Sequence, residues 1–243
     1  MKVLITGANG FIGRSLLSTN INGISYRLAV RNNSENFPNP HETVFINSIS
    51  SETDWSEPLE NIDAIVHLAG RAHVLRKGGN DPSSEYKKVN VDGTINLVKQ
   101  SILSGVKRFI FMSSIKVNGE TTSKDHPFTP EDKENPRDPY AESKYKVEKE
   151  LIRLTQREKM DYVILQIGEN VSPKEAFRDI FKLRSQADII IPYSTNDEVR
   201  ALHRRLLSKL FKYSSILLGS NPFDKRLTST ILSVSLTNTP KED

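Results

Sequence analysis

The sequence predicts an α/β fold, a doubly wound parallel sheet followed by a reduced and mostly helical C-terminal region. Two observations support this prediction. The chain opens with a short apolar run, Val3–Ile5, which stops at Thr6 and Gly7 before a helical stripe; this is the order strand, tight turn, helix. Further apolar runs with β-branched residues follow, separated by polar loops and helical patterns.

The remaining strands are predicted where these apolar runs end at turn residues. They cover 26–30, 43–46, 64–68, 108–112 and 161–167. A polar segment with four prolines, Asn118–Pro139, is too rich in breakers for a helix or a central strand, so we expect a loop over the edge of the sheet.

Two long helices are predicted from apolar residues at helical spacing, over 81–104 and 138–154. The first helix has two apolar stripes, namely Val91, Ile95, Val98 and Ile102, and Tyr86, Val89, Gly93 and Leu97. Two stripes need two packing partners. One partner is the sheet, and a second subunit is a candidate for the other, which gives the hypothesis of a homodimer through 86–104 and 140–159.

Glycines 7, 10 and 13 mark the turn after the first strand. Gly7 can take the sharp turn, Gly10 lets the backbone approach phosphates, and Gly13 lets the helix lie close to the strand. The free amides and the dipole at the start of the helix favour an anionic ligand. We therefore predict a dinucleotide pyrophosphate here; the alternative is an ordinary turn built from small residues.

The end of the strand 26–30 is where such a fold meets the adenosine ribose. An acid there would accept the 2′-hydroxyl, but this chain has Arg31, which favours NADP over NAD; a solvated surface arginine is the alternative. Ser48 and Ile49 are expected near the adenine. His67 lies within an apolar strand, so we expect a packed, hydrogen-bonded histidine, and no metal site is predicted.

The second long helix contains the chemistry. Tyr140 and Lys144 share one helical face with Val147, Leu151 and Leu154, so both are expected to point toward the sheet. A phenol with a pKa near 10 is a poor base at neutral pH, but a neighbouring ammonium favours the phenolate and can also bind ribose hydroxyls. The alternative is a snorkelling lysine at the start of an amphipathic helix.

Ser114 follows the strand 108–112 and is expected at the same edge, where its hydroxyl could hold a substrate oxygen.

Together these motifs resemble the extended short-chain dehydrogenase/reductases of the NAD-dependent epimerase/dehydratase family, with a Rossmann domain. The matching segments are TGANGFIG at 6–13, HLAG at 67–70, VNVDGT at 89–94, FMSSIKVNG at 111–119 and DPYAESK at 138–144. The subgroup that it most resembles handles nucleotide-sugars, UDP-sugars above all, in bacterial surface-polysaccharide synthesis, as 4-epimerases or 4-keto reductases.

The resemblance implies roles for the matching positions. Tyr140 would take a proton from a sugar hydroxyl, Lys144 would bind the ribose and lower the pKa of Tyr140, and Ser114 would hydrogen-bond the reacting oxygen. The expected cofactor contacts are Gly7, Gly10, Phe11, Ile12, Gly13, Arg31, Ser48, Ile49, Leu68, Ala69, Gly70, Asn90, Tyr140 and Lys144.

The resemblance ends after the strand 161–167. We expect an NAD(P)-binding domain over 1–167 and a truncated substrate-binding region over 168–243, with a helix after the capping box Ser172–Glu175 and another over 195–210. An NAD(P)-dependent nucleotide-sugar epimerase or reductase, either competent or degraded by the missing segment, is the leading interpretation. The alternatives are an inactive dinucleotide-binding sensor or partner of a full-length homologue, and a deletion product without a settled role.

Composition limits the classes of protein and of partner that fit this chain. The 243 residues include no cysteine, which is typical of a reducing cytoplasm, and no apolar run approaches the roughly 18 residues of a membrane span. The net charge of +4 comes from scattered basic residues without a basic arm, so neither nucleic acid nor a membrane is an expected partner. We expect a cytoplasmic protein.

Overall fold

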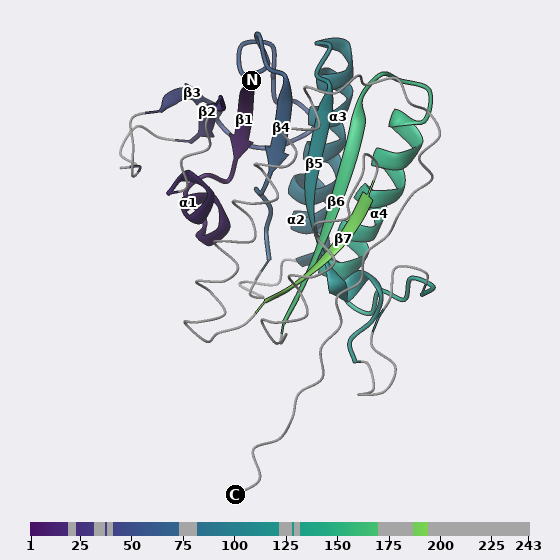
Figure 1. Ribbon diagram of the computed structural model, residues 1–243. Coiled ribbons are helices and arrows are strands. Elements are labelled where there is room, and N and C mark those ends of the chain that lie inside the picture. The colour runs from purple at the N-terminus through teal and green to yellow at the C-terminus, as the bar shows by residue number, and fades with distance from the viewer. Residues whose placement is uncertain are drawn as a thin grey trace, which may run out of the picture.

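The computed structural model describes residues 1–18, 23–31, 37, 41–72, 82–121, 128, 132–169 and 187–193. Its centre is a seven-stranded, fully parallel sheet in the order β3-β2-β1-β4-β5-β6-β7 (Figure 1). The strand order reverses direction between β1 and β4, so the doubly wound topology predicted from the sequence is confirmed. The strands are β1 (Lys2–Thr6), β2 (Ser25–Val30), β3 (Glu42–Phe45), β4 (Ala64–His67), β5 (Arg108–Ser114), β6 (Asp161–Glu169) and β7 (Ala187–Tyr193).

The first six strands match the predicted runs within two residues at each end. β7 was not predicted, although the run Asp188–Ile191 was a visible signal. It lies parallel to β6, from Val163 opposite Ala187 to Glu169 opposite Tyr193. The helices predicted after Ser172 and over 195–210 lie outside the described residues, and the division at 167 stays a prediction.

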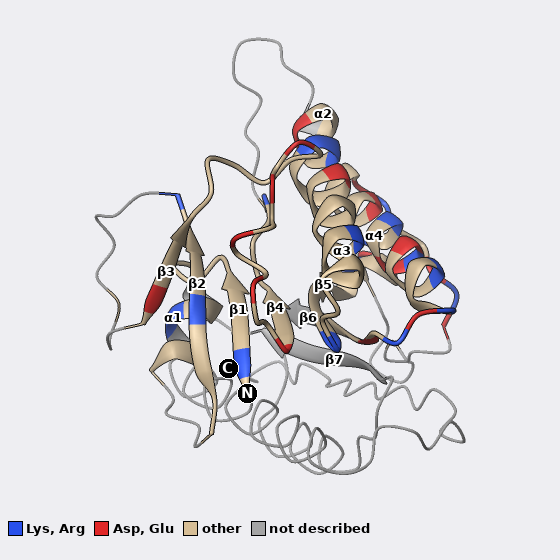
Figure 2. Cartoon of the chain, turned by 90° about the horizontal axis from the view of Figure 1, so that it is seen from above, with Lys and Arg blue, Asp and Glu red and all other residues tan. Residues whose placement is uncertain are grey.

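Helices cover both faces of the sheet. α1 (Phe11–Leu17) lies on one face, and α2 (Pro82–Tyr86), α3 (Thr94–Leu103) and α4 (Pro139–Thr155) lie on the other (Figures 1 and 2). Because successive residues of a strand face opposite sides, β1 contributes to two cores. Val3 and Ile5 pack with Leu16 of α1, whereas Leu4 packs with the side chains of α3 and α4.

The predicted helix 81–104 is interrupted by η1 (Lys87–Gly93), a π-helical stretch between α2 and α3. The wider turn changes which side chains face inward, so members of both apolar stripes are buried within one subunit: Tyr86, Val91, Gly93, Leu97 and Val98. The second stripe therefore needs no second subunit to cover it, and this part of the reasoning for a homodimer was wrong.

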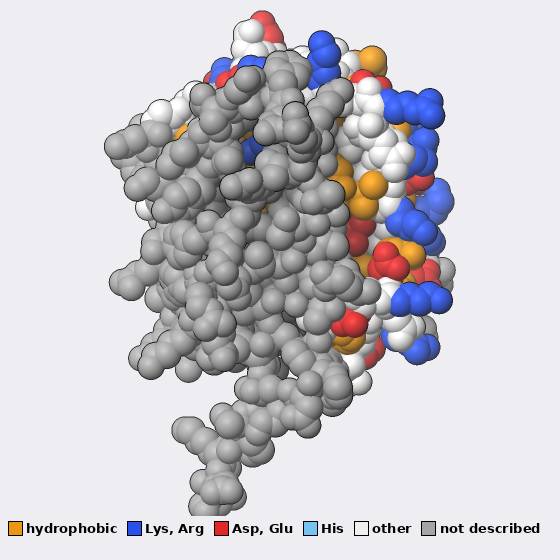
Figure 3. Space-filling model, turned by 45° about the vertical axis from the view of Figure 1, so that its right-hand side comes forward, with side chains coloured by type: hydrophobic (Ala, Val, Ile, Leu, Met, Phe, Trp, Pro, Cys, Tyr) orange, Lys and Arg blue, Asp and Glu red, His pale blue; other side chains and the backbone are white. Residues whose placement is uncertain are grey.

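The outward side of α4 is charged. Figure 2 shows residues of both signs along it, and Figure 3 shows Lys and Arg side chains gathered along one edge of the molecule. Glu142 pairs with Lys146, and Glu150 pairs with Arg153, all within this helix. No helix among the described residues has the length and apolar character needed to cross a bilayer.

Candidate active site

The glycine turn has the geometry that its sequence predicted. Gly7 has a φ of +71°, a conformation that L-residues with a side chain rarely adopt. A Cβ on Gly13 would lie 2.5 Å from the Gly7 carbonyl oxygen, so only glycine lets α1 lie this close to the end of β1. Gly10 donates its amide to the Gly7 carbonyl oxygen at 3.0 Å, which closes the turn.

Beneath this turn, His67 joins three elements. Its Nδ1 lies 2.8 Å from Thr6 Oγ1 on β1, and its Nε2 lies 2.9 Å from Thr94 Oγ1 on α3. Complete burial, and secondarily the charge of Lys144, lower the pKa of His67 to about 3, so the ring is neutral. The packed, hydrogen-bonded histidine that we expected is confirmed. Among the described residues, no cluster of three possible metal ligands is present.

The segment after β4 connects the glycine turn to Lys144. A Cβ on Gly7 would lie 2.7 Å from the Ala69 nitrogen, and a Cβ on Gly70 would lie 3.4 Å from Lys144 Nζ. Leu68 and Ala69 are half-buried, and Gly70 is exposed. The glycine turn and the buried ammonium therefore lie on either side of the segment Leu68–Gly70, which is the arrangement expected for a dinucleotide that reaches from one to the other.

Lys144 is buried with its Nζ donating to the Met112 carbonyl oxygen at 2.8 Å. The ammonium also lies 4.8 Å from the centre of the Phe111 ring and 5.8 Å from that of Tyr140. Burial lowers the pKa of Lys144 to about 8, and the nearby Glu148 carboxylate acts in the opposite direction. The inward lysine predicted from helical spacing is confirmed, and a snorkelling side chain is excluded.

Tyr140 begins the same face, half-buried, with its ring 5.8 Å from the ring of Tyr86 in an edge-to-face arrangement. Burial raises the pKa of Tyr140, while a hydrogen bond with Ser114 works against this rise. In the free protein the raising effect of burial prevails, and the expectation that Lys144 lowers the phenol pKa stays a prediction. Desolvation dominates, and the Lys144 ammonium is directed to the Met112 carbonyl oxygen instead.

Ser114 ends β5 and is held beside the start of α4. Two residues later, Lys116 donates to Asp138 Oδ2 at 2.9 Å, and Asp138 Oδ1 accepts the Ala141 amide at 2.7 Å as the N-cap of α4. One carboxylate thus joins the turn that carries Ser114 to the helix that carries Tyr140. The structure brings together all three predicted catalytic side chains.

The side chain of Asn90, an expected cofactor contact, makes its hydrogen bonds within the protein. Its Oδ1 accepts the Arg71 amide at 2.8 Å, and its Nδ2 donates to the Arg71 carbonyl oxygen at 2.9 Å and to Ser143 Oγ at 3.1 Å. The side chain is 2% exposed. Asn90 therefore holds the segment beside Gly70 in place, and its contact with a cofactor stays a prediction.

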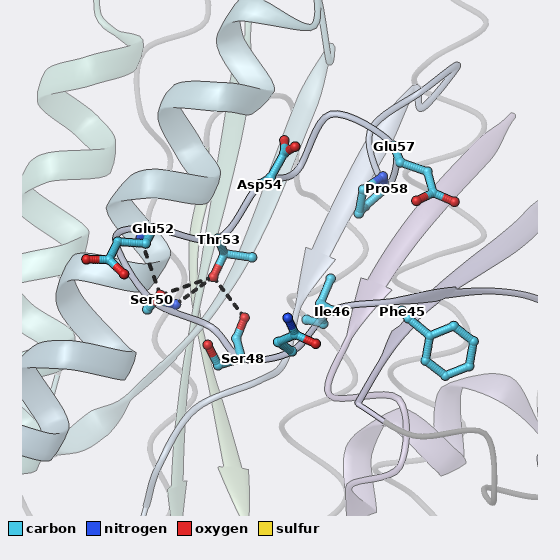
Figure 4. A pocket seen from close by; sticks show the side chains of 10 residues that line it. Phe45, Ile46, Ser48, Ser50, Glu52, Thr53, Asp54, Glu57 and Pro58 are labelled. Carbon is cyan, nitrogen blue, oxygen red and sulfur yellow. Dashed lines mark hydrogen bonds between the residues drawn. The ribbon is translucent and has the colours of Figure 1, made fainter.

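The residues expected near the adenosine, Arg31, Ser48 and Ile49, are more exposed than Lys144. Arg31 is exposed at the end of β2, and the side chain of Ile49 packs against Gly93. Ser48 lines a cavity of about 480 Å³ between the end of β3 and the loop 46–58 (Figure 4), where its carbonyl oxygen accepts the Thr53 hydroxyl at 2.8 Å. None of the glycine-turn residues lines this cavity. Ile12 is half-buried, and the side chain of Phe11 lies outside the described part.

Sequence reasoning missed a buried polar group beside the site. Glu148 accepts hydrogen bonds from Ser113 Oγ and from Gln166 Nε2, and all three side chains are buried. The signal was present in the sequence, because Glu148 lies four residues after Lys144 and therefore on the same inward face of the helix.

Comparisons with known proteins add an independent line of evidence. The sequence profile of the NAD dependent epimerase/dehydratase family matches residues 3–190. A UDP-glucose 4-epimerase of Vibrio cholerae is 38% identical over 198 residues, which are 80% of this chain and 60% of that protein. An N-acetyl-alpha-D-glucosaminyl-diphospho-ditrans,octacis-undecaprenol 4-epimerase of Escherichia coli O157:H7 is 32% identical over 62% of this chain and 42% of its own length. The chain thus spans 60% or less of these two relatives.

Solved structures support the fold. The UDP-glucuronic acid 4-epimerase of Bacillus cereus in complex with NAD is similar with a TM-score of 0.57 and 23% identity, over 75% of this chain and 62% of that chain. MoeE5 in complex with UDP-glucuronic acid and NAD is similar with a TM-score of 0.62 and 21% identity, over 97% of this chain and 76% of that chain.

Proposed function

Because this chain belongs to the NAD-dependent epimerase/dehydratase family, we propose that it binds a nicotinamide dinucleotide and acts in hydride transfer at a carbinol or ketone carbon of a nucleotide-sugar. The observation that supports this most is the placement of a buried ammonium, Lys144, beside Gly70 and next to the hydrogen-bonded pair of Tyr140 and Ser114. A purely structural core has no need of these three groups at the open edge of a sheet.

The residues present fit a dinucleotide. Gly7 and Gly13 let the backbone of the turn lie close to Ala69 and to the start of α1, and the turn lies at the carboxyl edge of the sheet where such ligands bind. We assign the pyrophosphate to this turn and the nicotinamide ribose to Lys144. When bound, the cofactor supplies the hydride acceptor or donor.

Side chains of the protein transfer the proton of the reacting sugar hydroxyl. Tyr140 Oη takes the proton of the sugar hydroxyl during oxidation and returns it during reduction, and Ser114 holds the same oxygen by a hydrogen bond. The free protein keeps the pKa of Tyr140 above its ordinary value through burial. The phenol is therefore poised as a proton donor, which suits a reductive half-reaction, and a cation close to it would be needed for the reverse step.

The finer assignments are a UDP-sugar as substrate and either epimerisation or 4-keto reduction as the net reaction. The Vibrio cholerae relative, a UDP-glucose 4-epimerase, supports the choice of substrate class. Arg31, exposed at the end of β2 in the place of an acid, supports NADP over NAD. A homodimer through α3 and α4 is a further proposal, supported by Leu103, which is 85% exposed at the end of α3; sedimentation as a monomer would refute it.

The test combines binding and turnover. Thermal shifts with NAD, NADP and a panel of UDP-sugars measure each ligand separately, and the absorbance of the reduced nicotinamide follows hydride transfer. Tyr140→Phe should lower turnover by about 10²–10⁴-fold while cofactor binding is kept. Cofactor binding without any turnover in either protein would instead support a non-catalytic dinucleotide-binding protein, and no shift with either dinucleotide would refute the proposal.

A further inference from the structure

The core behind the candidate site contains a carboxylate that packing does not require. Glu148 is 7% exposed and lies between α4, β5 and β6. Its oxygens accept from Ser113 Oγ on β5 and from Gln166 Nε2 on β6, the latter at 3.1 and 3.2 Å. The hydroxyl of Ser113 and the amide of Gln166 are both neutral donors.

A buried carboxylate is unfavourable unless charge and hydrogen bonds compensate for its lost hydration. Lys144 is the one buried lysine in the described part of the chain, and it lies one helical turn before Glu148 on the same inward face. An ammonium and a carboxylate therefore share a region from which water is excluded. Each charge offsets part of the burial penalty of its neighbour.

We propose that Glu148 is a positioning residue whose buried carboxylate holds Lys144 in its ammonium form at the cofactor-facing end of α4. Through Ser113, the same carboxylate also ties α4 to the residue directly before Ser114. The consequence for catalysis rests on the proposed function, whereas the electrostatic pairing does not.

The surroundings of Lys144 contain no other source of negative charge among the described groups that face it. β5 contributes the Met112 carbonyl oxygen and the Phe111 ring, and β4 contributes the neutral ring of His67. From α4 itself come the Tyr140 ring and Glu148, and from η1 the amide of Asn90, which lies beside Gly70. Burial already lowers the pKa of Lys144 to about 8, with Glu148 opposing that fall.

Removing the charge of Glu148 should make Lys144 easier to deprotonate. Without the carboxylate, the pKa of Lys144 falls further, so a larger share of the side chain is neutral at physiological pH. We expect Glu148→Gln, which keeps the size and an acceptor for Ser113, to increase the ratio of neutral to charged Lys144 by about 10-fold at a given pH. Glu142→Gln is the matched control, because it removes a carboxylate from the same helix whose side chain is 56% exposed and pairs with Lys146.

The experiment is an NMR titration of the whole chain labelled at lysine Cε and Nζ, between pH 6 and 10, with the Lys144 signal assigned by its absence in Lys144→Met. The expected result is a Lys144 titration midpoint at lower pH in Glu148→Gln and at unchanged pH in Glu142→Gln. An unchanged Lys144 titration in a folded Glu148→Gln protein overturns the proposal.

Reciprocity provides the second measurement if Glu148→Gln does not fold. The Glu148 carboxyl carbon, observed in glutamate-labelled protein, should titrate at higher pH in Lys144→Met than in the unaltered chain, because coupling between two sites acts equally in both directions. An unshifted Glu148 in Lys144→Met is the refuting result. Neither titration requires turnover, so a protein that never transfers hydride would refute the proposed function and leave this pairing testable.

Discussion

A methyl group placed on Gly7 should destabilise the protein by two separable effects. The φ of +71° costs a residue with a side chain about 1–2 kcal/mol. The new Cβ would also lie 2.7 Å from the Ala69 nitrogen and 2.8 Å from the Leu68 carbonyl carbon, which are backbone atoms that cannot rotate away. Overpacking of this kind costs about 1–3 kcal/mol. We therefore expect Gly7→Ala to lower the free energy of unfolding by roughly 2–5 kcal/mol.

Two control variants separate the effects. Gly105, just after α3, has a φ of +75°, but an added Cβ there would have nothing within 4 Å, so Gly105→Ala should show the conformational cost alone. Gly13 lies inside α1 and has contacts down to 2.5 Å, so Gly13→Ala should show a steric cost without the cost of a positive φ, reduced by the roughly 0.5–1 kcal/mol by which a helix favours alanine over glycine. Urea unfolding followed by circular dichroism gives all three values. If Gly7→Ala is no more destabilising than Gly105→Ala, the close approach of Ala69 does not matter and the reasoning fails.

Three further predictions concern ionisable side chains that are buried or paired. Because the folded pKa of His67 is about 3 and the ordinary value is 6.5, the unfolded chain binds the extra proton between these values, and stability should fall as pH drops below 6.5. At pH 5 the free energy of unfolding should be roughly 2 kcal/mol lower than at neutral pH because of His67, and urea unfolding of His67→Asn should lack this part of the loss. An equal dependence of unfolding free energy on pH in the two proteins would contradict the prediction. Lys116→Met should raise the pKa of Tyr140 and Asp138→Asn should lower it, because Lys116 lowers and Asp138 raises this pKa. Tyrosine ring-carbon NMR measures both, and shifts of the same sign would refute the arrangement. Arg27→Met should destabilise by roughly 2–4 kcal/mol in the same unfolding assay, since one guanidinium nitrogen serves three backbone carbonyl oxygens; a loss below about 1 kcal/mol would show that water replaces it.

The strands and the glycine turn were predictable because each depends on local pattern. β1 and β4 are short, continuous apolar runs, and the spacing of Gly7 and Gly13 follows directly from the sharp turn and the close helix. Lys144 could be placed inside for the same reason, because helical periodicity fixes which residues share a face. β7 was missed because Pro192 directly follows its apolar run, Ile189–Ile191, and a proline argues against a strand inside a sheet; β7 is the last strand in the sheet order, where a proline is tolerated.

What could not be predicted depends on contacts between distant segments. The π-helical form of η1 is not visible in its sequence; it accompanies the bonds of Asn90 to Arg71 and Ser143, and the contact of Gly93 with Ile49. The pKa of Tyr140 likewise depends on how deeply neighbouring segments of the fold bury this side chain, and residue spacing alone does not predict that burial.

The π-helical stretch also determines how much change in length this part of the chain can tolerate. A π-helical stretch holds one residue more than the α-helix that it interrupts, and its wider turn absorbs that residue. Deleting one residue within η1 would therefore let the stretch close to α-helical form, and α2 would keep its rotation relative to α3, with Tyr86 still beside Tyr140. A deletion within α3 would not be absorbed in this way, because each residue of an α-helix turns the chain by about 100° and Leu97 and Val98 would rotate away from the sheet.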